Sequence, residues 1–167
     1  MRSKLGKLVR AGFHDRMKRR LPSFAEDREA IVPQGSRMYS SILRPGFTAY
    51  IGLQVSDKDD SFTVNLAWSP HGKYPESTMT THDEVSKDGD CSFRLGHLFG
   101  RRQDFWWYLA RTGSIWDENF TVEEDSIEMA IPRVDPYLDD VFDMIESYAV
   151  PYFEKKSTKW ITFERRD

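Results

Sequence analysis

The chain has 167 residues, of which 39% are hydrophobic, 31% charged and 14% aromatic, and its formal net charge is −3. This length suits one domain with a sizeable core, and the aromatic content excludes a disordered chain. No apolar run has the length needed to cross a bilayer, and no signal-type apolar segment follows the basic N-terminus, so we expect a cytoplasmic protein. The single cysteine, Cys91, excludes an intramolecular disulfide and a cysteine-rich metal site.

The first predicted element is a helix from Ser3 to about Arg20. Its apolar residues recur near helical spacing with basic residues between them; they are Leu5, Leu8, Val9, Phe13 and Met17. Pro22 predicts the end of this helix by that position. Residues 22–37 contain two prolines and Gly35 and are expected to be irregular.

Three antiparallel strands are predicted next. Residues Arg37 to Leu43 form a strand candidate, and the sequence Arg44-Pro45-Gly46 predicts a tight turn. The stretches Phe47–Ser56 and Phe62–Trp68 then alternate between apolar and polar residues, as half-buried strands do. The polar link between them, residues 57–61, is short enough for a hairpin.

These two strands have one apolar and one mixed face, because successive side chains of a strand point to opposite sides. The apolar face carries Phe47, Ala49, Ile51, Leu53, Val55, Phe62, Val64, Leu66 and Trp68. The mixed face carries Tyr50, Gln54, Thr63 and Asn65. If helices cover the apolar face, the mixed face must meet either water or a ligand.

Residues 69–90 are predicted to be a long loop, because prolines, glycines and a Ser/Thr run interrupt every periodicity. Alternation returns from Cys91 to Phe99 and predicts a fourth strand with His97 on its apolar side. The segment Phe105–Ala110 suits a strand or a short helix, and residues 115–131 are expected to add a short strand or two.

The last predicted helix runs from Asp135 to Ala149, with Asp135 as its N-cap and Pro151 after its end. Residues 155–167 are expected to form a loose tail. The predicted fold is therefore a single α+β domain over residues 1–167. Its antiparallel sheet has about four to six strands and is packed on one face by an N-terminal and a C-terminal helix.

Several short segments together resemble a bacterial family of small cytosolic α+β proteins, a domain of unknown function. The segments are Leu8-Val-Arg-Ala-Gly-Phe13, Gly52-Leu-Gln-Val-Ser56, Phe62-Thr-Val-Asn-Leu66, Cys91-Ser-Phe-Arg-Leu-Gly96, Trp106-Trp107 and Val150-Pro-Tyr-Phe-Glu154. The resemblance spans about residues 5–157 and fits poorly at residues 16–20 and 69–90. It implies an α+β fold and a bacterial origin, and it implies no activity.

Charge is unevenly distributed along the chain. Residues 1–20 hold eight basic residues against Asp15, whereas residues 117–146 hold eleven acidic residues against Arg133. Clustered charge steers the association of proteins. One hypothesis is therefore that the chain is a non-enzymatic protein-binding module. Bacterial immunity proteins, which block a toxin by binding it, are an analogy for such a function. In this hypothesis a basic protein partner docks on the acidic region, through Asp139, Asp140, Asp143, Glu146, Trp116 and Phe120. The alternative is a solvated surface that offsets the basic N-terminus of the same molecule.

The rival hypothesis is a small enzyme or ligand-binding domain that uses the mixed sheet face, the 69–90 loop and His97. A deep cavity with converging polar groups favours this rival, and a flat acidic or aromatic patch favours the protein partner. The spacing of His71, His82 and the nearby carboxylates matches no strong metal signature, so we predict no metal and no cofactor. No catalytic residue is assigned. The sequence pI of 5.8 and the lack of a binding motif disfavour nucleic acid as a partner.

Overall fold

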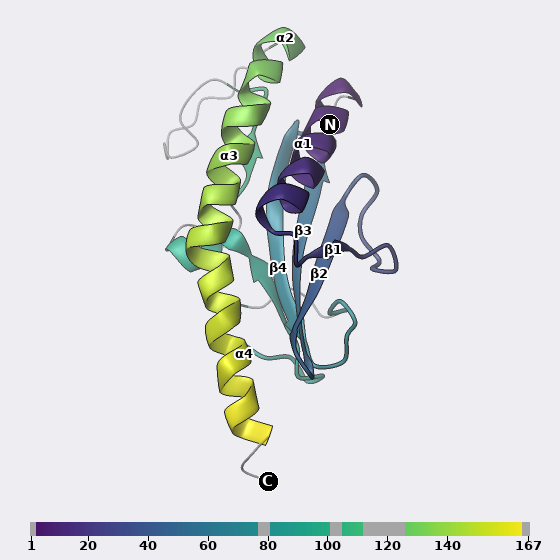
Figure 1. Cartoon of the computed structure of the whole chain (residues 1–167). Helices are drawn as coiled ribbons and strands as arrows, with labels where there is room; N and C mark the ends of the chain where they lie inside the picture. The colour runs from purple at the N-terminus through teal and green to yellow at the C-terminus, as the bar shows by residue number, and fades with distance from the viewer. Residues whose placement is uncertain (1–2, 77–80, 101–104, 112–125, 165–167) are drawn as a thin grey trace.

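The computed structural model describes residues 3–76, 81–100, 105–111 and 126–164, and the side chains of residues 161–164 are outside this description. The helix α1 (Ser3–Arg20) precedes a six-stranded antiparallel sheet, and a long helical segment follows it (Figure 1). This arrangement confirms the predicted α+β class.

The sheet has the strand order β1-β2-β3-β4-β5, and β6 also pairs with β4. The strands are β1 (Ala25–Glu26), β2 (Arg37–Arg44), β3 (Phe47–Ser56), β4 (Ser61–Ser69), β5 (Cys91–Arg94) and β6 (Trp107–Tyr108). Strands β5 and β6 pair with opposite ends of β4, since Trp68 faces Cys91 and Phe62 faces Trp107. The predicted central hairpin is confirmed, because Ile51 pairs with Leu66 and Leu53 pairs with Val64.

The apolar face of β3 and β4, here called the inner face, meets the helices (Figure 1). Every apolar residue that the alternation placed on this face is buried. The ring of Phe13 on α1 lies 5.8 Å from the Tyr39 ring and 5.0 Å from the Phe142 ring, so it joins the sheet to both helices. The main core therefore lies between the inner face and the helices.

The C-terminal helical segment is longer than predicted. It comprises α2 (Ile127–Ala130), the 3-10 helix η2 (Ile131–Arg133), α3 (Val134–Met144), the π-helical turn η3 (Ile145–Ala149) and α4 (Val150–Glu164). Asp135 lies inside this segment, so the prediction of an N-cap there is wrong. The short strand expected within residues 115–131 is also wrong where the structure describes it, because residues 127–131 are helical, while residues 115–125 lie outside the described residues.

Pro151 does not end the helix, and the loose tail expected from residue 155 is helical as far as Glu164. The cause lies in the preceding turn, where the Val150 N–H donates to the Ile145 carbonyl five residues back. A π-helical turn of this kind is wider than an α-helical turn, so the proline ring fits without ending the helix. Burial of Phe153 and Ser157 then holds α4 against the rest of the molecule.

The predicted fourth strand is shorter than expected. It ends at Arg94, and the 3-10 helix η1 (Leu95–Phe99) follows. Gly100 closes η1 with a φ of +68°, a left-handed conformation that glycine adopts without steric cost. Of the segment Phe105–Ala110, only Trp107 and Tyr108 form a strand.

Candidate functional site

The mixed face of the sheet, here called the outer face, is covered by loops and not by helices. Met38, Tyr50 and Ala67 form a second small buried cluster there. Ala30, Val32 and Tyr74 pack against this cluster and are partly buried themselves. Residues 27–36 and 70–76 are thus the two loops that lie over the outer face.

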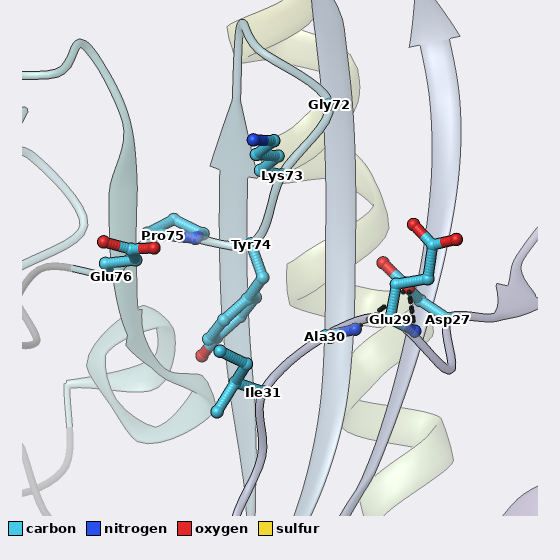
Figure 2. A pocket seen from close by; sticks show the side chains of 9 residues that line it. All are labelled: Asp27, Glu29, Ala30, Ile31, Gly72, Lys73, Tyr74, Pro75 and Glu76. Atoms are coloured by element: carbon cyan, nitrogen blue, oxygen red, sulfur yellow. Dashed lines mark hydrogen bonds between the residues drawn. The ribbon is translucent and has the colours of Figure 1, made fainter.

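An open groove of about 520 Å³ lies between these two loops. Figure 2 shows the side chains that line it, which come from two segments 40 or more residues apart in the chain: Asp27, Glu29, Ala30, Ile31, Gly72, Lys73, Tyr74, Pro75 and Glu76. Ligand-binding clefts in proteins have volumes of roughly 300–1,000 Å³. The groove is therefore large enough for a small ligand or for a few residues of a partner chain.

The first loop is held by Asp27, directly after β1. The Asp27 N–H donates to the Met38 carbonyl at 2.8 Å. One oxygen of its carboxylate accepts hydrogen bonds from the backbone N–H groups of Glu29 (3.0 Å) and Ala30 (3.2 Å), which are the dashed lines in Figure 2. This turn presents Ile31, whose side chain is 91% exposed. A large apolar side chain is thus displayed to solvent at the edge of the groove.

The second loop carries Tyr74 between Lys73 and the buried Pro75. Its ring meets the Tyr50 ring edge-on, with centroids 5.5 Å apart. The start of the loop is tied down as well, because the His71 N–H donates to Ser69 Oγ at 3.1 Å and the His71 ring is hydrogen-bonded to the Asp88 carbonyl at 2.8 Å. The two walls of the groove are therefore positioned by β-strand ends and by contacts to Tyr50.

Tyr50 on β3 packs against Tyr74 of the second loop and does not itself line the groove. Its side chain is fully buried, and its hydroxyl has no hydrogen-bond partner within the described part of the chain. Burial raises the pKa of Tyr50 to about 12, and the Asp27 carboxylate adds to this rise. Burial likewise raises the pKa of Tyr74 to about 12. Both hydroxyls are protonated at neutral pH, as tyrosine hydroxyls ordinarily are.

The groove is acidic. Its lining includes the carboxylates of Asp27, Glu29 and Glu76 against the single ammonium group of Lys73. Such an excess of negative charge attracts cationic groups and repels anions.

No protein-family model matches this chain, and no curated protein or solved structure matches it either. The family resemblance noted in the sequence therefore stays a prediction. The arrangement of the groove is the evidence from which function has to be argued.

Four of the five residues predicted as a ligand face do lie together on the outer face. Asn65 Nδ2 donates to Gln54 Oε1 at 2.9 Å, and Thr63 Oγ1 donates to the Phe105 carbonyl at 2.6 Å. Asn65 Oδ1 is buried and has no partner among the described residues. Within the described residues, the bond from Asn65 to Gln54 is the one hydrogen bond between two of these side chains, and none of the four lines the groove.

His97, which the ligand-binding hypothesis grouped with these residues, is not part of the outer face. Because the chain leaves the sheet after Arg94, His97 lies on η1, and its ring centroid is 6.2 Å from that of Phe93 and 6.4 Å from that of His82. Phe93 belongs to the main core, so His97 is at the edge of the inner face. Burial lowers the pKa of His97, and the neighbouring His82 and Arg94 lower it further.

The acidic residues predicted to dock a partner are largely engaged within the molecule. Asp139 forms an ion pair with Arg16 at 2.9 Å. Arg20 pairs with Asp143 at 2.8 Å and with Glu146 at 2.7 Å, and this contact lowers the pKa of Glu146. Asp140 is exposed, and Trp116 and Phe120 lie outside the described residues. This pairing of α1 with α3 and η3 supports the alternative interpretation, in which these acids offset the basic N-terminus.

The groove residues Asp27, Ile31 and Tyr74 were missed in the sequence because they lie in segments without periodicity. One signal was present: an isoleucine and a valine stand together in an otherwise polar, proline-containing stretch, at Ile31 and Val32. A loop that carries apolar residues either packs on the fold or presents them to a partner, and here Val32 packs whereas Ile31 is presented.

Among the described residues, no group of three or more His, Cys, Asp or Glu side chains is arranged to hold a metal ion. His82, one of the two loop histidines, lies 3.2 Å from its neighbour Asp83, whereas His71 is hydrogen-bonded to a backbone carbonyl. Within the same described part of the chain, none of the helices combines the length and the apolar character that a membrane-spanning helix requires.

Proposed function

We propose that this chain is a non-enzymatic protein-binding module and that the groove between residues 27–31 and 72–76 is its contact surface. The observation that carries the proposal is the display of Ile31, 91% exposed, beside the ring of Tyr74 in an open groove. Exposed large apolar side chains next to a tyrosine are typical of the centre of protein interfaces. Burial of Ile31 by a partner would contribute about 1.5–3 kcal/mol, which is enough for an interface anchor.

The proposed contact surface is the groove, and not the acidic helix on which the sequence hypothesis placed the partner. Asp139, Asp143 and Glu146 form ion pairs with Arg16 and Arg20, so these carboxylates are engaged within the molecule. The carboxylates of the groove outnumber its lysine, and a basic protein partner therefore suits this surface as well. Inhibition of a basic toxin by direct contact would be one form of such a function.

The test places a photo-crosslinking amino acid at position 31 of the full chain in cells that naturally carry the protein. A matched control carries the same amino acid in place of Ile42, an isoleucine on β2 that is 75% exposed and does not line the groove. A partner that crosslinks at position 31 alone is then purified and titrated against Ile31→Asp and Ile42→Asp. We expect at least about tenfold weaker binding for Ile31→Asp only, since an interface anchor is worth 1.4 kcal/mol or more. Equal effects of the two variants would contradict the proposed surface.

Binding of a small ligand is a second candidate function, favoured by the volume of the groove. A ligand that binds the folded state alone raises the melting temperature in a concentration-dependent way. A panel of small cationic and aromatic compounds should then contain one that stabilises the wild type and does not stabilise Tyr74→Ala.

A further inference from the structure

We propose that residues 81–90 form a latch that opens when the pH falls from neutral to mildly acidic, and that the pair His82 and His97 is its sensor. The inference goes beyond the proposed function, because it concerns a conformational change at the edge of the inner face and not the groove. It rests on a cluster of rings around Phe93 and on the hydrogen bonds that hold the loop beside this cluster.

The two imidazole rings pack on the same aromatic side chain. The ring centroid of His82 lies 6.1 Å from that of Phe93 and 6.4 Å from that of His97, and the His97 ring lies 6.2 Å from Phe93. The Tyr152 ring of α4 completes the cluster, at 5.0 Å from Phe93 and 6.3 Å from His82. The cluster therefore joins the loop to β5, η1 and α4.

Hydrogen bonds hold the start of the loop beside this cluster. The Tyr152 hydroxyl donates to the His82 carbonyl at 2.9 Å and accepts from the indole N–H of Trp68 at 3.1 Å. The Cys91 thiol donates to the Thr81 carbonyl at 3.6 Å. The closed position of residues 81 and 82 therefore depends on contacts to α4 and β5 that lie next to the histidine pair.

Protonation of the pair disfavours the closed loop. His82 Nε2 lies 3.2 Å from an Asp83 carboxylate oxygen, whereas His82 Nδ1 is buried and has no hydrogen-bond partner among the described residues. A neutral His82 ring can place its proton on Nε2, but a second proton on Nδ1 would bury a donor without an acceptor. A positive charge on His97 would also repel one on His82, since solvent screens charges less beside packed aromatic rings.

The elements packed around the pair carry charges of both signs. The charged and titratable groups among these neighbours are Asp83 and Glu84 on the loop, Cys91 and Arg94 on β5, Tyr152 and Lys156 on α4, and on η3 Glu146, which is paired with Arg20, and Tyr148, which contacts Phe99. Burial lowers the pKa of His97, and His82 and Arg94 lower it further. The closed loop is therefore fully favoured above the ordinary histidine pKa of about 6.5 and loses stability as the pH falls below it.

The test uses Cys91, the single cysteine, which is fully buried against the loop. The full chain reacts with dithiodipyridine, which modifies thiols at acidic as well as neutral pH, and each rate is divided by that of the urea-unfolded chain at the same pH. We expect this relative rate to be about fivefold higher at pH 5 than at pH 7.5, because protonation of the pair favours the open loop. An unchanged relative rate would overturn the inference.

Variants of the protein localise the sensor. His82→Gln combined with His97→Gln should reduce the pH effect to less than about twofold, because glutamine is polar and does not titrate. The matched control is His14→Gln, which changes a histidine on α1 that is hydrogen-bonded to Tyr39 and should keep the full pH effect. Equal pH effects in the double variant and the control would overturn the assignment of the sensor.

Tyr152→Phe tests the latch itself. It removes the hydrogen bond to the His82 carbonyl and leaves both imidazoles in place. The relative rate should therefore rise by a similar factor at both pH values, while the ratio between them stays near that of the wild type. A rate equal to that of the wild type would mean that this bond does not hold the loop closed, and it would overturn the latch.

Urea separates opening of the loop from unfolding of the whole chain. Release of one loop exposes far less surface than global unfolding, so the relative rate at pH 5 should depend only weakly on low concentrations of urea. Urea denaturation at the same pH, followed by circular dichroism, gives the dependence expected for global unfolding. An equally steep dependence of the thiol reaction would assign the exposure of Cys91 to global unfolding and would overturn the latch.

Discussion

The two faces of the strands β3 and β4 have different roles in the protein. On the inner face, Ile51 and Leu66 pair across the strands and are closed off by the helices. On the outer face, Tyr50 and Asn65 each keep a buried polar atom that is unsatisfied within the described residues, and loops cover them. The inner face therefore supplies stability, and the outer face retains hydrogen-bonding capacity that folding does not use.

Magnitudes support this contrast. Each large apolar side chain buried on the inner face contributes about 1.5–3 kcal/mol to stability. An unsatisfied polar group buried on the outer face costs about 1–3 kcal/mol. A protein that keeps such groups deviates from the most stable sequence, and deviations of this kind are most common at binding sites.

The largest expected effect is that of Leu66→Ala on the inner face. Removing the side chain leaves a cavity between β4 and the helices, so we expect a loss of about 2–5 kcal/mol in the free energy of unfolding. Urea denaturation followed by circular dichroism measures it. Wild-type stability in this variant would mean that Leu66 does not face the core.

The next largest effect is expected from Arg16, which links α1 to α3 by ion pairs. Arg16 is only 7% exposed and donates to the Gly12 carbonyl as well as to Asp135 and Asp139. We expect Arg16→Ala to cost about 1–3 kcal/mol, because it removes the charge-assisted hydrogen bonds of a buried guanidinium.

Arg19 is the control, since it makes an exposed pair with Asp15 at 2.9 Å. Exposed pairs four residues apart on a helix contribute about 0.3–0.5 kcal/mol, so Arg19→Ala should change stability by no more than that. Equal losses in the two variants, measured in the same denaturant series, would show that Arg16 is not a special contact.

The contrast between the faces also explains which features could be predicted from the sequence. The inner face has strict period-two alternation, and its register is strongly specified because a shift by one residue would expose every core side chain. The α1 helix was equally clear, since its apolar residues recur at helical spacing and Pro22 follows it. The α+β class and the central hairpin were accordingly correct.

The features that could not be predicted depend on tertiary context. Pro151 is normally a sign that a helix ends, and only the π-helical turn before it allows α4 to continue. The strand from Cys91 ends early at Arg94, although alternation persists beyond it and places His97 on an apparent strand face. The groove is formed by two loops that meet over the sheet, and loop sequences contain no periodicity from which this meeting could be inferred.

A smaller effect is expected from His97 at the edge of the inner face. Its pKa is lowered in the folded protein, so the unfolded chain takes up a proton more readily. Stability is therefore complete above the ordinary histidine pKa of about 6.5 and decreases as the pH falls below that value towards the lowered one. Because His97→Gln removes this titrating group, the melting temperature of the variant should decrease less than that of the wild type between pH 7.5 and 5. An identical pH profile for wild type and variant would show that His97 does not contribute.

The smallest expected effects are those of removing the hydroxyl from two buried tyrosines, one on each face of the sheet. Their comparison distinguishes the two faces most directly. Tyr39 on the inner face has its hydroxyl hydrogen-bonded to His14 Nδ1 at 2.9 Å, whereas the Tyr50 hydroxyl on the outer face has no partner in the described structure. Removing a satisfied hydroxyl costs about 0.5–1.5 kcal/mol, which we expect for Tyr39→Phe. Removing an unsatisfied one relieves a penalty, so Tyr50→Phe should be neutral or slightly stabilising. Denaturant unfolding of both variants checks this, and a loss in Tyr50→Phe as large as that in Tyr39→Phe would mean that the outer hydroxyl already has a structural partner.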